Sequence, residues 1–239
     1  MSNLLSTLSA NLAAVRDRIA AAADRSNRDP DEVVLVAVTK YAELDWVRGL
    51  IDLGVTQLGE SRPQQLVSRS ESLAGPVTWH LIGHLQRNKV RPVLPVATLI
   101  HSVDSFRLLD RIETIAEELG VAPRVLLEVN VTREESKNGF VPSDLLGHSD
   151  RLTGYRHLVV DGLMTMAPRV DDPELARPAF ASLRQLRETL AAATGPNVPL
   201  GELSMGMSGD FEIAVEEGAT LVRIGSGLFA GLASDEARP

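Results

Sequence analysis

Cysteine is absent from the 239-residue sequence, which excludes disulfides, thiolate metal sites and a cysteine nucleophile. Aromatic residues are also few, with two Trp, two Tyr and five Phe, and 32 acidic against 24 basic residues give a net charge of −8. Nucleic acids and anionic membranes are bound by basic surfaces, so we expect neither as a partner. No apolar run reaches the ~20 residues of a membrane span, and the N-terminus lacks the basic segment of a signal peptide. We therefore expect a soluble, cytoplasmic protein.

Lysine is scarce as well. Lys40, Lys89 and Lys137 are the three lysines among the 24 basic residues, and the other 21 are arginine. Arginine stays charged, whereas a lysine can lose its proton and act as a nucleophile. Each lysine position is therefore informative, unless the scarcity reflects compositional bias alone. Lys89 and Lys137 lie in polar segments, whereas Lys40 ends an apolar one.

The chain does contain a regular alternation of apolar runs and helical patterns. A first helix is predicted over residues 1–26, where apolar residues recur at steps of three and four. Eight apolar runs then predict strands at residues 33–38, 56–58, 78–82, 98–100, 124–129, 157–163, 200–203 and 220–224. Helices are predicted at 105–119, with Asp104 or Ser105 as N-cap and Gly120 after its end, and near 174–193.

This alternation predicts the fold class. Strands that are apolar on both faces belong to parallel sheets covered by helices. Eight strand–helix units in about 210 residues predict a single α/β domain, a (β/α)8 TIM barrel with an extra N-terminal helix. An open doubly wound sheet is the alternative. No linker, charge block or fixed-period repeat divides the chain, so we expect one domain over residues 1–239.

Two charged side chains are predicted at strand ends, where α/β proteins gather their reactive groups. Lys40 closes the run EVVLVAVTK, and Arg223 interrupts the apolar run in TLVRIGSGLFAG. The last strand of a barrel neighbours the first, so both side chains can face one cavity. A lysine held against low-dielectric walls has a lowered pKa, and its neutral amine can add to an aldehyde. The alternative is a structural lysine whose stem is buried and whose ammonium reaches solvent.

Two turns near the C-terminus predict an anion site. Gly225 and Gly227 let the backbone approach a ligand, and a helix starting at Ser226 would present free N–H groups to a phosphate. Ser208 precedes another predicted helix, and its hydroxyl either caps that helix or binds the same anion. Each turn alone is weak evidence, because most such turns hold no ligand.

The histidines do not predict a metal site. His80 and His84 are four residues apart, but Gly83 and a strand-to-loop context disrupt the helical geometry of an HxxxH pair. The sequence also lacks GxSxG, GxGxxG and P-loop motifs. We therefore expect no metal and no serine-hydrolase triad.

Seven strings carry a family resemblance: AVTK, GESRPQQ, WHLIGHLQRNKV, IHSVDS, EVNVTREESKNGF, GLMTMAP and SMGMSGDFEIAVEEGATLVRIGSGLFAG. From about residue 33 to residue 231, the chain resembles the YggS/PROSC family of pyridoxal 5′-phosphate (PLP) homeostasis proteins. The resemblance implies a barrel similar to the N-terminal domain of fold-type III PLP enzymes such as alanine racemase. It implies that Lys40 forms the Schiff base with PLP and that Arg223 contacts the pyridine nitrogen. It further implies that Ser208, Gly225 and Ser226 hold the phosphate.

Two positions depart from the family pattern. The family commonly has Asn and a following Glu where this chain has Ser61 and Gln65, and the Asn lies near the cofactor. Ser61 is retained as an expected cofactor-binding residue, although its shorter side chain lacks the amide contacts. Ser226 replaces a common Thr and keeps the hydroxyl.

The resemblance implies a PLP carrier that buffers or supplies the cofactor, with PLP-dependent apoenzymes as possible partners. A guanidinium at the pyridine nitrogen can only donate, which makes the cofactor a weak electron sink. Racemases of this fold take a second acid/base Tyr from a C-terminal β-domain, for which this sequence leaves no room, so we expect a monomeric carrier and no catalytic residues. A stand-alone PLP-dependent amino-acid racemase is the alternative, and a barrel for another phosphorylated ligand is a third reading.

Overall fold

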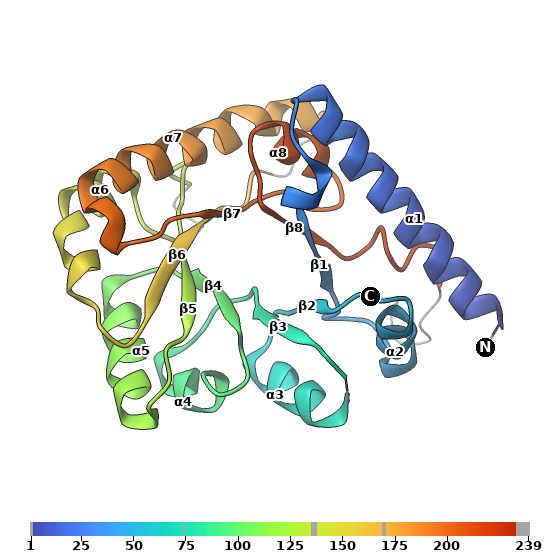
Figure 1. Ribbon diagram of the computed structural model, residues 1–239, viewed down its shortest axis with the longest axis horizontal. Helices are drawn as coiled ribbons and strands as arrows, with labels where there is room; N and C mark the ends of the chain where they lie inside the picture. The colour runs from blue at the N-terminus through green and yellow to red at the C-terminus, as the bar shows by residue number, and fades with distance from the viewer. Residues whose placement is uncertain (1, 74, 135–137, 169–170, 233–239) are drawn as a thin grey trace.

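A closed parallel barrel forms the centre of the computed structural model, which describes residues 2–73, 75–134, 138–168 and 171–232 (Figure 1). Eight strands pair in sequence order, and β8 closes on β1. They are β1 Val34–Val38, β2 Gln57–Glu60, β3 Thr78–Leu81, β4 Leu99–Val103, β5 Arg124–Glu128, β6 Val159–Met164, β7 Glu202–Ser204 and β8 Leu221–Ile224. The predicted (β/α)8 barrel is confirmed, and the open-sheet alternative is wrong.

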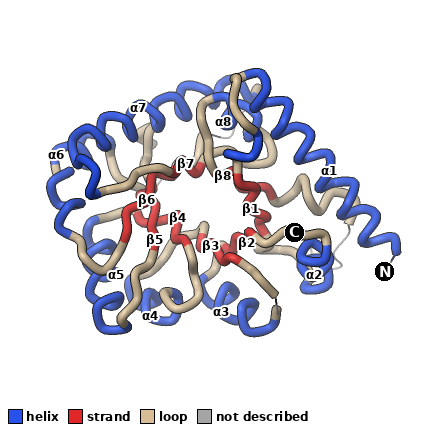
Figure 2. The backbone as a smooth tube through the Cα atoms, viewed as in Figure 1, coloured by secondary structure: helices blue, strands red, loops and turns tan. Residues whose placement is uncertain are grey.

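Helices surround the ring of strands on its outer side (Figure 2). They are α1 Ser2–Arg25, α2 Leu44–Asp52, α3 Pro63–Ser72, α4 Val90–Val93, α5 Phe106–Leu119, α6 Pro142–Gly147, α7 Arg177–Thr194 and α8 Phe211–Glu216. Short 3-10 turns occur at Pro30–Glu32, Arg87–Lys89, Ser149–Gly154, Pro173–Ala176 and Gly195–Asn197. The predicted N-terminal helix is α1, which packs against α2 and α8. Within the described part of the chain, no helix has the length and apolar character needed to cross a membrane.

The ends of α5 and α7 agree only in part with the predicted signals. Gly120 follows α5 in the left-handed conformation, with φ of 66°, as its sequence position predicts. Ser105 occupies the N-cap position, but its hydroxyl donates to Asp104 and makes no capping hydrogen bond. The second predicted helix starts later than expected, because residues 173–176 form a 3-10 turn and α7 begins at Arg177.

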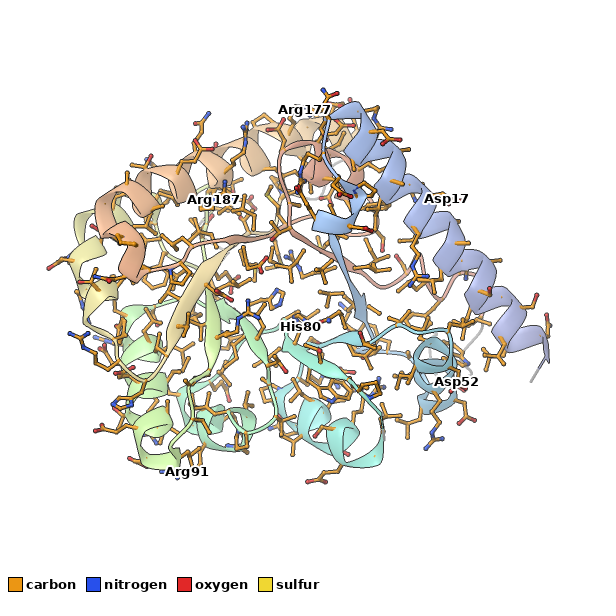
Figure 3. All side chains as sticks on the ribbon, in the orientation of Figure 1. Asp17, Asp52, His80, Arg91, Arg177 and Arg187 are labelled. Atoms are coloured by element: carbon orange, nitrogen blue, oxygen red, sulfur yellow. The ribbon has the colours of Figure 1, made fainter. Side chains whose placement is uncertain are left out.

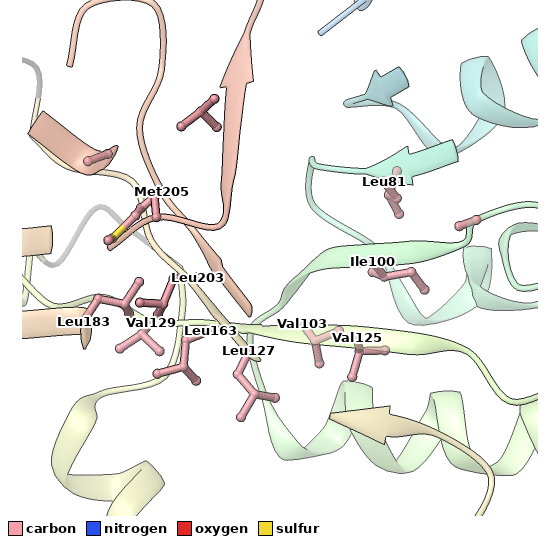
Figure 4. Close-up of a cluster of buried hydrophobic side chains, with 14 of the residues drawn as sticks. Leu81, Ile100, Val103, Val125, Leu127, Val129, Leu163, Leu183, Leu203 and Met205 are labelled. Atoms are coloured by element: carbon pink, nitrogen blue, oxygen red, sulfur yellow. The ribbon is translucent and has the colours of Figure 1, made fainter. Parts of the chain in front are cut away.

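Apolar side chains form two layers separated by the strands. The inner cluster comes from five different strands: Val36, Leu99, Leu126, Met164 and Leu221. Val125 and Leu127, which flank Leu126 in β5, belong to a much larger cluster that fills the space between strands and helices (Figure 4). Adjacent residues of a strand face opposite sides, so the small cluster lies inside the barrel and the large one outside it.

The barrel interior is more polar than expected from strands that are apolar on both faces. His80, His101, Ser204 and Arg223 are all buried and come from four different strands. Figure 3 shows His80 near the centre of the ring of strands. A buried polar group is costly unless it has a hydrogen-bond partner, so these four side chains require an explanation.

Candidate functional site

The ends of β1 and β8 lie side by side at one end of the barrel. Val36 pairs with Arg223 across the two strands. Lys40 follows β1 by two residues and is exposed, whereas Arg223 is 5% exposed. The turn after β8 also approaches β1, since a Cβ built on Gly225 would lie 3.4 Å from the Cβ and from the carbonyl oxygen of Val38. The structure thus brings the Lys40 and Gly225 segments together, as the barrel topology predicts.

Arg223 is held by two oxygen atoms inside the barrel. Its Nη1 donates to Ser204 Oγ at 2.5 Å, and its Nη2 donates to the Thr165 carbonyl at 3.0 Å. Burial lowers the pKa of Arg223 to about 10, and the carboxylates of Asp210 and Glu128 oppose this shift. A pKa of about 10 still leaves the guanidinium charged at neutral pH. Arg223 therefore supplies a fixed positive charge below the mouth of the barrel.

A hydrogen-bonded chain continues from Arg223 across the barrel interior. Ser204 Oγ lies 2.8 Å from His101 Nδ1, and His101 Nε2 lies 2.8 Å from His80 Nδ1. His80 Nε2 lies 2.8 Å from Gln57 Oε1. Burial lowers the pKa of His80 to about 4 and that of His101 well below its ordinary value, so both rings are neutral at pH 7.

The direction of this chain follows from its first member. A guanidinium can only donate, so the Ser204 hydroxyl directs its own proton to His101 Nδ1. His101 then carries its proton on Nε2 and donates to His80, which in turn donates to Gln57. Every member is satisfied, and the chain fixes the orientation of the Arg223 guanidinium.

The two turns predicted to bind an anion meet at the same end of the barrel. The Gly227 N–H donates to Ser208 Oγ at 3.4 Å. From α1, the Asn11 amide donates to the carbonyls of Leu228 and Ala230 at 3.0 and 2.9 Å. The long N-terminal helix therefore holds the turn that follows β8, and this turn is fixed against Ser208.

Two details of the predicted anion site are wrong. Residues 226–231 form successive turns instead of a helix; Gly227 disfavours a helix, and the Asn11 amide of α1 donates to two carbonyls of the segment. Ser208 does not cap α8, whose N-cap is Asp210; the Asp210 carboxylate accepts the Met207 N–H at 2.6 Å. Turn N–H groups and the hydroxyls of Ser208 and Ser226 lie at this corner, and Ser226 is exposed; that they bind an anion stays a prediction.

The turn between β7 and α8 depends on glycine. Gly206 has φ of 90°, and a Cβ there would lie 2.6 Å from the Ala214 Cβ and 2.9 Å from the Phe211 Cα. Its carbonyl accepts the Arg223 N–H at 3.0 Å. Close packing of this turn on α8 therefore fixes the backbone of both Ser208 and Arg223.

Ser61 follows β2 at the same end of the barrel and is half-buried. Its backbone packs tightly on Gly83, where a Cβ would lie 2.1 Å from the Ser61 carbonyl oxygen. The Ser102 hydroxyl donates to the Gly83 carbonyl at 2.6 Å. The position of Ser61 is thus well determined, and its contact with a ligand stays a prediction.

The sequence reasoning missed the side chains that hold the Lys40 turn. Arg69 of α3 donates to the carbonyls of Thr39 and Ala42 at 2.8 and 2.5 Å. Gln65 donates to the Lys40 carbonyl at 3.3 Å, and an amide can do so where a carboxylate cannot. The available signal was the four-residue spacing of Gln65 and Arg69, which places both on one face of a helix, in the segment directly after the strand that neighbours β1.

The inner polar chain was also missed, although it left a trace in the sequence. His80 and His101 lie inside mainly apolar runs, VTWHL and LIHSV, and Ser204 follows Leu203. A polar residue in a strand that is otherwise apolar on both faces indicates a polar partner within the barrel. Among the described residues, no group of three or more His, Cys, Asp or Glu side chains is placed to hold a metal ion.

The chain is similar in sequence to known proteins over most of its length. Residues 10–233 match the profile of the family described as "Alanine racemase, N-terminal domain". The chain is 40% identical over 219 residues to the pyridoxal phosphate homeostasis protein of Aquifex aeolicus, with 91% of this chain and 95% of the relative covered. It is 38% identical to the protein of that name from Pseudomonas aeruginosa, with 94% and 96% covered.

Solved structures agree with these sequence matches. A protein from Bifidobacterium adolescentis superposes with a TM-score of 0.90 at 36% identity, covering 96% of this chain and 97% of that one. PipY of Synechococcus elongatus, solved with PLP bound, gives a TM-score of 0.79 at 35% identity, covering 90% and 99%. Alanine racemase of Clostridium difficile shares the fold, with a TM-score of 0.74 at 15% identity over 96% of this chain and 58% of the racemase. The chain therefore belongs to the pyridoxal phosphate homeostasis protein family, which is built on the barrel of the alanine racemase N-terminal domain.

Proposed function

We propose that this protein binds PLP at the carboxyl end of its barrel, carries it as a Schiff base on Lys40, and buffers or supplies it to PLP-dependent apoenzymes. The observation that carries the proposal is the convergence of Lys40, Arg223 and the Ser208–Gly227 corner at neighbouring strand ends. The names of the relatives and the PLP bound to PipY support it. A cytoplasmic monomer is the form in which we expect the protein to act.

The donor set fits the chemistry of PLP, which combines an aldehyde, a pyridine nitrogen and a phosphate. Lys40 is exposed at a strand end, so its amine is accessible to an aldehyde. Arg223 offers a fixed N–H donor for the ring nitrogen. Ser208, Gly225 and Ser226 offer hydroxyl and backbone N–H groups of the kind that bind phosphate. A Ser61 contact completes the proposed set.

Arg223 also favours carriage of the cofactor over demanding chemistry. Bound PLP supplies an electrophilic carbon and an electron-withdrawing ring. Because Arg223 keeps its proton at neutral pH, it donates to the ring nitrogen and does not protonate it. The neutral chain behind it, which ends at Gln57, provides no acidic proton at pH 7 either. The site therefore holds the ring in its weaker electron-withdrawing form.

The absorption spectrum of the purified protein tests the proposal. The wild-type protein loaded with PLP is expected to absorb at about 420 nm, and borohydride is expected to fix the cofactor on the Lys40 peptide. Lys40→Ala is expected to lose the band, whereas the matched control Lys89→Ala keeps it. A retained band in Lys40→Ala would show that another group holds the aldehyde.

Racemase activity is the second candidate, and one contact favours testing it. The ring of Tyr41 lies 5.0 Å from Lys40 Nζ, and Tyr41 is 72% exposed. A phenol beside the cofactor lysine is a candidate second acid/base. We expect no change in the optical rotation of amino acids beyond that caused by free PLP. Turnover that exceeds free PLP and disappears in Tyr41→Phe would favour the racemase.

A further inference from the structure

We propose that the buried ion pair of Glu60 and Arg69 is a positioning device for Lys40: it fixes the turn that carries this lysine while the side chain stays free to react. The inference rests on the proposed function, because it assigns the pair a role in cofactor binding. Glu60 and Arg69 act through the backbone of residues 39–42 and touch no cofactor atom in this scheme.

The first observation is that Arg69 holds the backbone on both sides of Lys40, and we call these two Arg69 contacts the bracket. The Arg69 guanidinium donates to the Thr39 carbonyl at 2.8 Å and to the Ala42 carbonyl at 2.5 Å, one on each side of Lys40. The Ala42 N–H donates to the same Thr39 carbonyl at 2.9 Å, which closes a four-residue turn. Gln65, one helical turn before Arg69, donates to the Lys40 carbonyl at 3.3 Å. One face of α3 therefore engages three of the four carbonyls of the turn.

The second observation is that Arg69 is buried in an ion pair with Glu60. Arg69 is 8% exposed and Glu60 is fully buried, with Glu60 Oε1 at 2.9 Å from Arg69 Nη1. The Thr39 hydroxyl donates to Glu60 Oε1 at 2.5 Å. Burial raises the pKa of Glu60, and the Thr39 hydrogen bond and the Arg69 charge oppose this shift. Placing two charges out of water is costly, and a turn as such needs none.

The third observation is the contrast between the Lys40 backbone and its side chain. Charge-assisted donors hold carbonyls more firmly than neutral ones, so the turn is rigid. The Lys40 side chain is exposed, and its ammonium lies 5.0 Å from the Tyr41 ring. A reactive lysine benefits from this combination, because a fixed Cα limits where the amine can reach and lowers the ordering cost of ligand binding.

Four variants separate positioning from simple stability. Arg69→Met removes the bracket and leaves Glu60 buried without its cation. The double variant Glu60→Gln/Arg69→Met removes the bracket and the unpaired charge together. Lys40→Ala reports on the proposed function, and Arg48→Met is the control, since Arg48 pairs with Asp45 on the exposed face of α2. The PLP dissociation constant from absorbance titration and the melting temperature are measured for each.

Arg69→Met is expected to lose both stability and PLP affinity. In the double variant we expect the melting temperature to recover toward the wild-type value, while PLP still binds about tenfold more weakly. Wild-type affinity in the double variant would overturn the inference, because the pair would then serve stability alone. A retained band in Lys40→Ala would instead refute the proposed function, and the positioning role with it.

Gln65→Ala keeps the inference falsifiable if the double variant does not fold. It removes one neutral donor to the turn and leaves the buried pair intact. We expect affinity for PLP to fall about threefold at an unchanged melting temperature. Gln64→Ala, at the adjacent exposed position, is the matched control and is expected to bind as the wild type does. Equal PLP affinity of the two glutamine variants would contradict the proposal that the contacts from α3 position Lys40.

Discussion

Exposed arginines and buried arginines of this protein have different partners. On the surface, Arg177 contacts the carboxylates of Glu174, Glu216 and Glu217 at distances of 2.7 to 3.0 Å. Inside, Arg223 donates to a serine hydroxyl and to a backbone carbonyl. Solvent screens the outer pairs, whereas the inner guanidinium sits in a medium of low dielectric constant.

The difference shows what each group of arginines does. The outer network links α1, α7 and α8 by pairs that are individually weak and replaceable. Arg69, which lies on α3 against the barrel, and Arg223, which lies inside it, are both buried at an energetic cost. We propose that each positions a group at the cofactor site. Burial therefore separates Arg69 and Arg223, which we propose to act at the cofactor site, from the exposed arginines of a chain in which 21 of the 24 basic residues are arginine.

We expect the largest effect on PLP affinity from Arg223→Met, which tests this contrast. The substitution removes the donor that we propose for the ring nitrogen, and we expect PLP affinity to fall about tenfold to hundredfold. Titration followed by absorbance measures this change. Arg91→Met, which breaks an exposed pair with Glu118, is the control and should leave the affinity unchanged. Equal affinity of the two variants would remove the distinction between buried and exposed arginines.

The inner chain also predicts a pH dependence of stability. Burial lowers the pKa of His80 to about 4, below its ordinary value of 6.5. His80 therefore binds a proton at a higher pH in the unfolded chain than in the folded one. The stability that depends on its neutral ring is fully present above about pH 6.5 and is lost as the pH falls toward 4. From pH 7 to pH 5, His80 alone should lower the free energy of unfolding by about 2 kcal/mol.

Urea unfolding at the two pH values, in the wild type and in His80→Gln, measures the His80 contribution. The raised pKa values of Glu60, Glu128 and Asp210, caused mainly by burial, act in the opposite direction, because these carboxyls favour the folded state at low pH. They are common to both proteins and cancel in the difference. His148→Gln, at an exposed position, should keep the wild-type dependence; the same dependence in His80→Gln would exclude a neutral buried ring.

The smallest effect is expected from the outer network. Arg25→Met removes an exposed guanidinium that lies 2.7 Å from Glu216. We expect a loss of less than about 1 kcal/mol in the free energy of unfolding, and this loss should shrink at about 1 M salt because the pair is screened. PLP affinity should not change. A stability loss as large as that of Arg69→Met would show that exposure does not separate the two groups.

Sequence reasoning predicted much of the fold and the proximity of the first and last strands. Apolar runs located all eight strands, and the position of Lys40 and Arg223 at the ends of the first and last runs placed them together. The helix expected at Ser226 did not form; the segment contains Gly227, and a distant asparagine donates to two of its carbonyls. Strand boundaries differed where interior polar residues interrupt the apolar pattern, as in β4, which continues through His101 and Ser102 to Val103.

By itself, the sequence determined the barrel, because strand and helix periodicities are local properties of hydrophobic burial. It also determined that one lysine of three ends an apolar strand. Tertiary structure alone decided which polar groups meet: His101 contacts Ser204 across 103 residues, and Arg69 reaches the Thr39 carbonyl across 30. Such contacts depend on strand register and on the rotation of each helix about its axis, which only the packing of the closed barrel sets.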